Sequence, residues 1–404
     1  MAVAAGNYQR VLTLPGVATL LVLMFAARIP VAATNMVLTL HVVLTLHRDY
    51  GSAGLVGAVG TVGIAIGAPL TGRVVDGFGL RRMVVITTIG YGAYWLTAWL
   101  LPYPALLVIS FFGGLSALPV MSVGRQALAA LVPLEHRRAA FSLDSISLEM
   151  SFMVGPAVGV LIATKVSTTA AVISVGCLLV LAGIALFVVN PPVRGKHDEH
   201  WDGVRPPRRQ WLKSQLLAAL AASCGAVFVL AGTEVAIVAA LRGVGQISWT
   251  GVVTIAMCVA SATGGAVYGT LRRSPGPLVL MSVLGLLVVP VGLLGGRWWV
   301  LCLALIPSSL MCAPTLTSTA DRVSRLSPAS VRGEAMGLHS SALTLGGALG
   351  APVVGTVVDH FGAVGGFAAA GIGGILIAVL AVPLARRRDV RTDHSAGRAI
   401  PVAH

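Results

Sequence analysis

The chain has 404 residues, of which 56% are hydrophobic and only 10% charged, and its mean hydropathy is +0.89. Soluble globular proteins carry about 25% charged residues, so this composition excludes a water-soluble domain and indicates a chain embedded in lipid. Lys and Arg outnumber Asp and Glu by 28 to 14, and the net charge of +14 would suggest a nucleic-acid partner in a soluble protein.

Twelve apolar segments follow one another along the chain. A bilayer core about 30 Å thick is crossed by about 20 apolar residues in a helix. The segments are 13–40, 52–72, 82–101, 104–125, 141–163, 168–189, 212–240, 247–271, 276–296, 298–319, 333–357 and 363–385. We therefore predict an all-α integral membrane protein with a six-helix bundle over 1–190, a linker over 191–211, a second six-helix bundle over 212–385 and a tail over 386–404.

Basic residues gather on alternate loops. With the N-terminus inside, 23 Lys and Arg residues, Arg125 among them, lie in cytoplasmic segments, and the outer loops hold four, namely Arg48, Lys165, Arg242 and Arg297. Because loops rich in Lys and Arg stay in the cytoplasm, we predict a multi-pass protein of the cell (inner) membrane with both termini cytoplasmic. The basic excess is then a topology signal, and we expect no nucleic-acid partner.

The two halves resemble each other. The pattern Arg137-x-Ala-Ala-Phe-x-Leu recurs as Arg332-x-Glu-Ala-Met-x-Leu, and Pro156-x-x-Gly recurs as Pro352-x-x-Gly. Parallel repeats of this kind build transporters whose binding site lies between the halves near the middle of the membrane. We therefore expect two pseudo-symmetric bundles around a central site.

The first predicted helix carries an ionisable residue, Arg28, just before Pro30. Charges inside a membrane span are costly and usually face a cavity or a partner. Asn35 lies seven residues further on, on the same helix face. We predict that Arg28 and Asn35 line the central cavity.

The loop after the second predicted helix holds the most specific motif, Gly72-Arg-Val-Val-Asp76-Gly-Phe-Gly79-Leu-Arg81-Arg82. It resembles the signature loop of the major facilitator superfamily, G-x-x-x-D-x-x-G followed by two basic residues. The basic pair begins one residue late here, because Leu80 stands at the usual first basic position. The resemblance implies a twelve-helix transporter fold over the whole chain and a loop that latches the inner gate in the outward-facing state.

The residues of this loop support the same interpretation. Gly72 lets the helix end approach a neighbour, and Gly79 permits a turn with positive φ. Asp76 can accept hydrogen bonds from an Arg or from a helix N-terminus, where the helix dipole favours an anion. The alternative is a tight solvated turn anchored by Arg81 and Arg82.

The fifth predicted helix contains two carboxylates. Glu149 continues a polar stripe with Ser142 and Ser145, and we predict that it lines the cavity and binds substrate or a proton. The alternative is a structural ion pair between Arg28 and Glu149. Asp144 lies nearer the inner boundary on another helix face, where we expect a gate or cap residue.

The same helix continues with Gly155-Pro156-Ala-Val-Gly159, which resembles the core of a motif associated with exporter-type members of the superfamily. Gly155 and Gly159 are four residues apart and make a smooth face for close helix packing. Pro156 frees a backbone carbonyl and bends the helix. The motif favours antiport, and ordinary packing of small residues is the alternative.

Two further titratable residues lie inside predicted spans. Glu234, in the outer half of the seventh helix, is a candidate cavity residue. His339, in the eleventh helix, is the repeat counterpart of Asp144, and the two form a possible gate pair. A hydrogen-bonded packing residue is the alternative for His339.

No phosphate-binding loop, nucleophile elbow or metal-ligand cluster occurs in the sequence. We therefore expect no ATP site, no cofactor, no metal and no enzymatic activity. The sequence predicts a secondary active transporter, acting as a monomer, that exports a small drug-like or metabolite molecule by proton-coupled alternating access. The alternatives are a proton-coupled importer of the same fold and a transporter-like membrane sensor or scaffold.

Overall fold

The computed structural model of the chain describes residues 8–193, 206–271, 275–295 and 297–386. Residues 194–205 of the predicted linker and 387–404 of the predicted tail lie outside this part. Within the described residues the regular structure is entirely helical. This agrees with the requirement that a backbone in lipid satisfy its hydrogen bonds internally.

The helices form two groups. The N bundle consists of α2 (Val17–Leu44), α3 (Tyr50–Phe78), α4 (Leu80–Thr97), α5 (Tyr103–Leu115), α6 (Val120–Leu131), α7 (Arg137–Lys165) and α8 (Thr168–Val189). The short helix α9 (Arg208–Trp211) precedes the C bundle. The C bundle consists of α10 (Ser214–Gly243), α11 (Thr250–Tyr268), α12 (Pro277–Val288), α13 (Trp298–Leu326) and α14 (Arg332–Arg386).

Eleven spans in the described residues are long and apolar enough to cross a membrane. α5 and α6 together form one of them, Tyr103–Leu131. The last, Ala329–Arg386, holds two helices, because α14 breaks at Gly362, whose φ of 68° and ψ of −171° are not helical. The predicted twelve-helix, all-α membrane fold is thus confirmed.

Several predicted segments end too early. The second, fourth and tenth were expected to end at residues 72, 125 and 319, whereas the spans continue to Phe78, Leu131 and Leu326. Arg125, which was expected in a cytoplasmic loop, therefore lies within a span. Arg125 is buried, with 2% of its surface exposed, and a carboxylate inside the N bundle compensates its charge.

Helix starts follow local chemistry. The Asp49 carboxylate accepts a hydrogen bond from the Ser52 backbone amide at 2.8 Å and so caps α3. Hydrogen bonds from Ser52 hold the pKa of Asp49 below its ordinary value. The Ser167 hydroxyl caps α8 in the same way.

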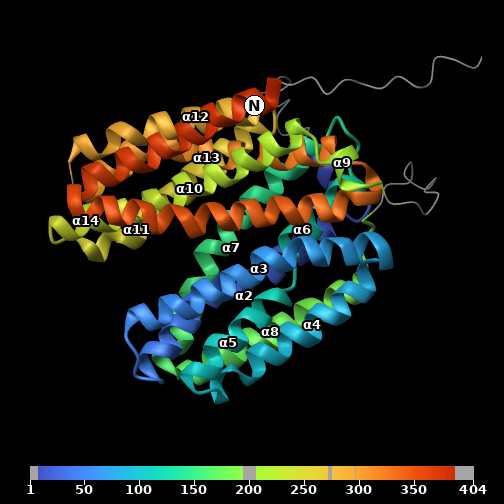
Figure 1. Cartoon of the computed structure of the whole chain (residues 1–404), viewed down its shortest axis with the longest axis horizontal. Helices are drawn as coiled ribbons and strands as arrows, with labels where there is room; N and C mark the ends of the chain where they lie inside the picture. Colours follow the sequence, from blue (N-terminus) through green and yellow to red (C-terminus); the bar gives the residue numbers. More distant parts are fainter. Residues whose placement is uncertain (1–7, 194–205, 272–274, 296, 387–404) are drawn as a thin grey trace, which may run out of the picture.

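Each bundle has its own apolar core. The largest cluster of buried apolar side chains lies within residues 11–186, and the second lies within 228–370. Between the bundles, α3 packs against α14, and α7 packs against α11 and α13. Figure 1 shows the bundles adjacent at the end that carries α9, called here the linker end, and farther apart at the opposite end.

Candidate functional site

Asp76 joins the bundles at the linker end. One carboxylate oxygen accepts a hydrogen bond from the Gly333 backbone amide and the other from the Glu334 amide, each at 2.8 Å. The Gln126 side-chain amide lies 3.5 Å from the first oxygen. Both backbone amides belong to the first turn of α14, where N–H groups lack partners within the helix and the dipole favours an anion. The buried Asp76 carboxylate therefore caps a helix of the opposite bundle.

Glycines bring the backbones of α3 and α14 together beside this contact. A Cβ atom at Gly72 would overlap the carbonyl oxygen of Gly333, and one at Gly337 would overlap that of Ala68. The Ser341 hydroxyl donates a hydrogen bond to the Ala65 carbonyl at 2.6 Å. α3 and α14 therefore approach closely over several turns.

A second ionic contact lies beside the first. The Glu334 carboxylate is 1% exposed and accepts hydrogen bonds from Arg73 at 2.8 Å and from Arg208 at 2.6 and 2.9 Å. Arg73 is on α3 of the N bundle, and Arg208 is on α9. One carboxylate thus connects α14, the N bundle and the segment before the C bundle.

The other motif residues stay within the N bundle. Gly79 ends α3 with a φ of 85°. The Arg81 guanidinium lies over the Phe187 ring and donates to its carbonyl oxygen at 3.4 Å. Arg82 lies over the ring of Phe78. Of the five predicted gating residues, Gly72 and Asp76 therefore touch the opposite bundle.

A fully buried polar network lies deeper in the molecule. Arg28 on α2 forms an ion pair with Asp144 on α7 at 2.6 Å and donates to its backbone carbonyl at 3.2 Å. Arg125 on α6 lies 3.4 Å from the other Asp144 oxygen. Arg125 also lies 3.3 Å from His339 on α14, whose second ring nitrogen lies 3.1 Å from the Thr319 hydroxyl.

This network changes two of the pairings considered from the sequence. Arg28 pairs with Asp144 and not with Glu149, because positions 144 and 149 lie about 140° apart around a helix. Asp144 and His339 belong to one network, but Arg125 stands between them. Arg125 had been assigned to a loop, so the sequence interpretation missed it. The sequence feature that could have indicated a buried Arg125 is Asp144, because a buried acid needs basic partners.

Glu149 lies between the bundles. It is on α7, and one carboxylate oxygen accepts hydrogen bonds from the Ser261 hydroxyl at 2.8 Å and the Cys312 thiol at 3.6 Å. These partners are on α11 and α13 of the C bundle. One helical turn towards the linker end, the Ser145 and Thr317 hydroxyls share a hydrogen bond of 2.9 Å across the same interface.

The remaining cavity candidates are exposed. Glu234 lies on α10 of the C bundle. Asn35 lies on α2, two turns from the buried Arg28. Its side chain is exposed, because neighbouring helices do not cover this part of α2. Arg28 itself has no exposed surface.

The small-residue motif of the fifth span packs within the N bundle. A Cβ atom at Gly155 would come within 2.5 Å of the Ile29 carbonyl oxygen, and one at Gly159 within 2.8 Å of the Val37 side chain. Pro156 lies between them inside α7. The motif therefore allows the close α2–α7 contact that positions Arg28 against Asp144.

Tyr8 adds a contact that the sequence did not reveal. It lies in a helical turn at residues 8–12, before the first span, and its hydroxyl donates to the Ala266 carbonyl on α11 at 2.5 Å. Burial raises the pKa of Tyr8 above its ordinary value of 10. The N-terminal segment is thereby attached to the C bundle.

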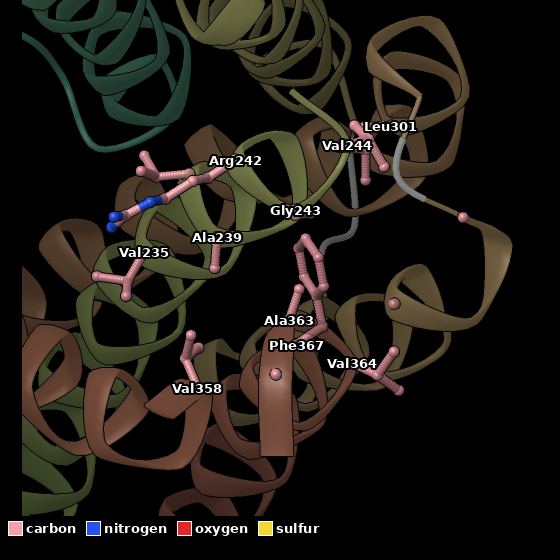
Figure 2. A pocket seen from close by; sticks show the side chains of 15 residues that line it. Val235, Ala239, Arg242, Gly243, Val244, Leu301, Val358, Ala363, Val364 and Phe367 are labelled. Carbon is pink, nitrogen blue, oxygen red and sulfur yellow. The ribbon is translucent and has the colours of Figure 1, made fainter. Parts of the chain in front are cut away.

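A pocket of about 860 Å³ lies in the C bundle at the end opposite the linker end. Figure 2 shows Val235, Ala239 and Arg242 of α10 on one side, with Val358 and Phe367 of α14 nearby. Arg242 is the one charged residue among those that line it. None of the predicted site residues lines this pocket.

The chain is similar in sequence and structure to known transporters. A sequence model described as the Major Facilitator Superfamily matches residues 20–294 and 235–401. No curated protein matches the chain. The human organic anion transporter TETRAN superposes with a TM-score of 0.69 at 18% identity, over 93% of this chain and 99% of that one.

Two solved sugar symporters have similar scores. The proton:xylose symporter XylE, bound to 6-bromo-6-deoxy-D-glucose, gives a TM-score of 0.70 at 13% identity, over 91% of this chain and 96% of that one. The E. coli fucose:proton symporter FucP gives 0.70 at 14% identity, over 92% and 98%. At these identities the likeness concerns the fold.

Proposed function

Because the chain belongs to the major facilitator superfamily and is a secondary transporter rather than an enzyme, we propose that it exports a small organic molecule in exchange for protons, by alternating access. The distribution of Lys and Arg supports the cell membrane as its location, with both termini cytoplasmic. The linker end is then the cytoplasmic end.

The contacts between the bundles support an outward-facing state. Among the described residues, the hydrogen bonds that join the bundles lie in the half of the molecule next to the linker end, from Asp76 to Glu149. At the opposite end the bundles diverge (Figure 1). We propose that Gly72, Asp76 and Arg73 hold the inner gate shut and that the gate opens when α14 leaves α3.

The proposal that transport is coupled to protons rests on the surroundings of Glu149. Its carboxylate bonds to hydroxyl and thiol groups of the opposite bundle, and no Arg or Lys among the described residues forms an ion pair with it. An anion at this depth is costly. Binding of a proton, or of a cationic group of the substrate, neutralises the carboxylate and removes this cost. We therefore assign Glu149 as the proton carrier and Glu234 as a cavity residue.

The test begins with a ligand-stabilisation screen on purified protein, followed by flux of the hits in proteoliposomes under an imposed pH gradient. Glu149→Gln should abolish the pH dependence of transport while the protein still folds and inserts. Glu135→Gln is the matched control, because Glu135 is 77% exposed in a loop. Unchanged transport and an unchanged pH profile in Glu149→Gln would remove Glu149 from the proton path.

The direction of transport is tested in the same vesicles. Export requires that substrate move against the inward flow of protons. XylE and FucP are proton symporters, so the fold also accommodates proton symport. Accumulation of substrate together with inward proton flow would replace the export proposal with a symport mechanism.

A further inference from the structure

His339 has a defined hydrogen-bonding state. Its Nδ1 atom lies 3.3 Å from an Arg125 guanidinium nitrogen, and its Nε2 atom lies 3.1 Å from the Thr319 hydroxyl oxygen. The Thr319 hydroxyl donates its own proton to the Leu316 carbonyl at 2.9 Å. The imidazole is fully buried.

These partners fix the protonation of the ring. A guanidinium has only donors, so Nδ1 must present its lone pair to Arg125. The Thr319 proton is already donated, so Nε2 carries the hydrogen and donates to the Thr319 oxygen. His339 is therefore neutral in this conformation, with its single acceptor atom occupied by Arg125.

The Arg125–His339 contact is the place where the buried network passes from one bundle to the other. Arg28, Asp144 and Arg125 belong to the N bundle, whereas Thr319 and His339 belong to the C bundle. In the gate opening proposed above, Arg125 would stay with Asp144, its partner within the N bundle, and Nδ1 would lose its donor.

We propose that His339 is a proton-binding site of the linker-end gate, with Nδ1 bound to Arg125 when the gate is closed and to a proton when it is open. The proposal rests on the alternating access proposed above. The proton comes from water on the linker-end side, adds to the Nδ1 lone pair and returns to that water before closure. Acid on this side therefore favours the open gate.

Electrostatic repulsion prevents Nδ1 from binding a proton while Arg125 is beside it. Arg125 on α6 is the charged group that faces the imidazole. Behind it lie Asp144 on α7 and Arg28 on α2, and α13 presents the neutral Thr319. Two guanidinium groups already share one carboxylate, so an imidazolium would add a second uncompensated positive charge inside the protein.

Hydrogen–deuterium exchange of the full chain in lipid nanodiscs tests the proposal. The readout is amide exchange over residues 332–341 of α14, corrected for intrinsic exchange, between about pH 8 and about pH 5.5, the range in which histidine titrates. Corrected exchange should rise as pH falls, by at most about tenfold per pH unit for a single proton. Exchange that does not change with pH in the wild-type chain overturns the proposal without recourse to any variant.

Variants identify the group that titrates. His339→Asn keeps an acceptor near the Nδ1 position but takes up no proton, so the pH dependence should disappear, and His339→Gln serves if the first variant does not fold. Ser341→Ala, which removes an uncharged contact of the same helix with Ala65, should raise exchange equally at every pH. If exchange still depends on pH in both His339→Asn and His339→Gln, the group that titrates is not His339.

The same measurement separates this proposal from the broader one. If Asp76→Asn increases amide exchange over residues 332–341 but a lower pH does not, the alternating-access proposal stands and the role of His339 is wrong. If neither Asp76→Asn nor pH changes exchange there, the gate itself has been placed wrongly.

Discussion

Arg28 and Asp144 form an ion pair of 2.6 Å in which neither side chain has any exposed surface. Asp144 also receives Arg125 at 3.4 Å, so one carboxylate holds two buried guanidinium groups from two other helices. Breaking a buried ion pair by removing one partner is far more costly than replacing the whole pair, because the remaining charge is left uncompensated. Asp144 is therefore the central residue of the polar interior of the N bundle.

The first prediction concerns this residue. Asp144→Asn retains the shape of the side chain but leaves Arg28 and Arg125 without a counter-charge. We expect a loss of about 3–5 kcal/mol in stability, measured as a lower melting temperature and a smaller folded fraction in nanodiscs. Asp321→Asn is the control, because Asp321 pairs with the partly exposed Arg325 and its loss should cost less than about 1 kcal/mol. Equal destabilisation by the two variants would contradict the central role of Asp144.

Hydropathy and turn residues were sufficient to predict the helices, since both are local properties of the sequence. The resemblance of residues 72–82 to the superfamily's signature loop identified Asp76 as a gating residue, and its place beside a helix end agrees with that role. Neither observation identified its partner. The backbone amides of Gly333 and Glu334 carry no sequence signal, and their position depends on how two distant helices meet.

Charge pairing was harder to predict, because it depends on the rotation of each helix about its axis. The sequence suggested Glu149 as the ion-pair partner of Arg28, whereas packing at Gly155 and Gly159 selects Asp144. Arg125 was assigned to a loop because a segment defined by hydropathy is ended at the first charged residue. A buried arginine compensated by Asp144 cannot be recognised until the helices are placed.

The second prediction concerns the helix cap formed by Asp76. Asparagine offers one acceptor oxygen where two backbone amides now donate, and it removes the charge that the α14 dipole favours. Asp76→Asn should therefore increase amide exchange at Gly333 and Glu334 by about tenfold or more, equivalent to about 1.4 kcal/mol. Asp359→Asn, at an exposed position in α14, should leave exchange at these amides unchanged. A silent Asp76→Asn variant would show that the contact does not hold the bundles together.

The third prediction compares two glycines of α3. A Cβ atom at Gly72 would overlap the Gly333 carbonyl oxygen, whereas one at Gly77 would meet nothing within 4 Å. Gly72→Ala should push α14 away from α3, lower the melting temperature and slow flux in proteoliposomes. Gly77→Ala should be neutral or stabilise the helix by up to about 1 kcal/mol. If both variants behave like the wild-type protein, α3 and α14 do not need to approach this closely during transport.

The last prediction concerns α9, the short helix before the C bundle. Arg208 bonds to the buried Glu334 carboxylate, and the adjacent Arg209 is exposed and makes no hydrogen bond to it. Trp211, three residues after Arg208, is 3% exposed. Because Arg208 is itself 54% exposed, its ion pair should contribute at most about 1 kcal/mol.

Arg208→Ala should therefore release α9 and increase chymotryptic cleavage at Trp211 by up to about fivefold. Arg209→Ala, which removes the same charge one residue away, should leave cleavage unchanged. Salt at about 1 M should bring the wild-type rate towards that of Arg208→Ala, because a partly exposed ion pair is screened. Equal cleavage in the two alanine variants would mean that α9 is held by Trp211 packing and not by the ion pair between Arg208 and Glu334.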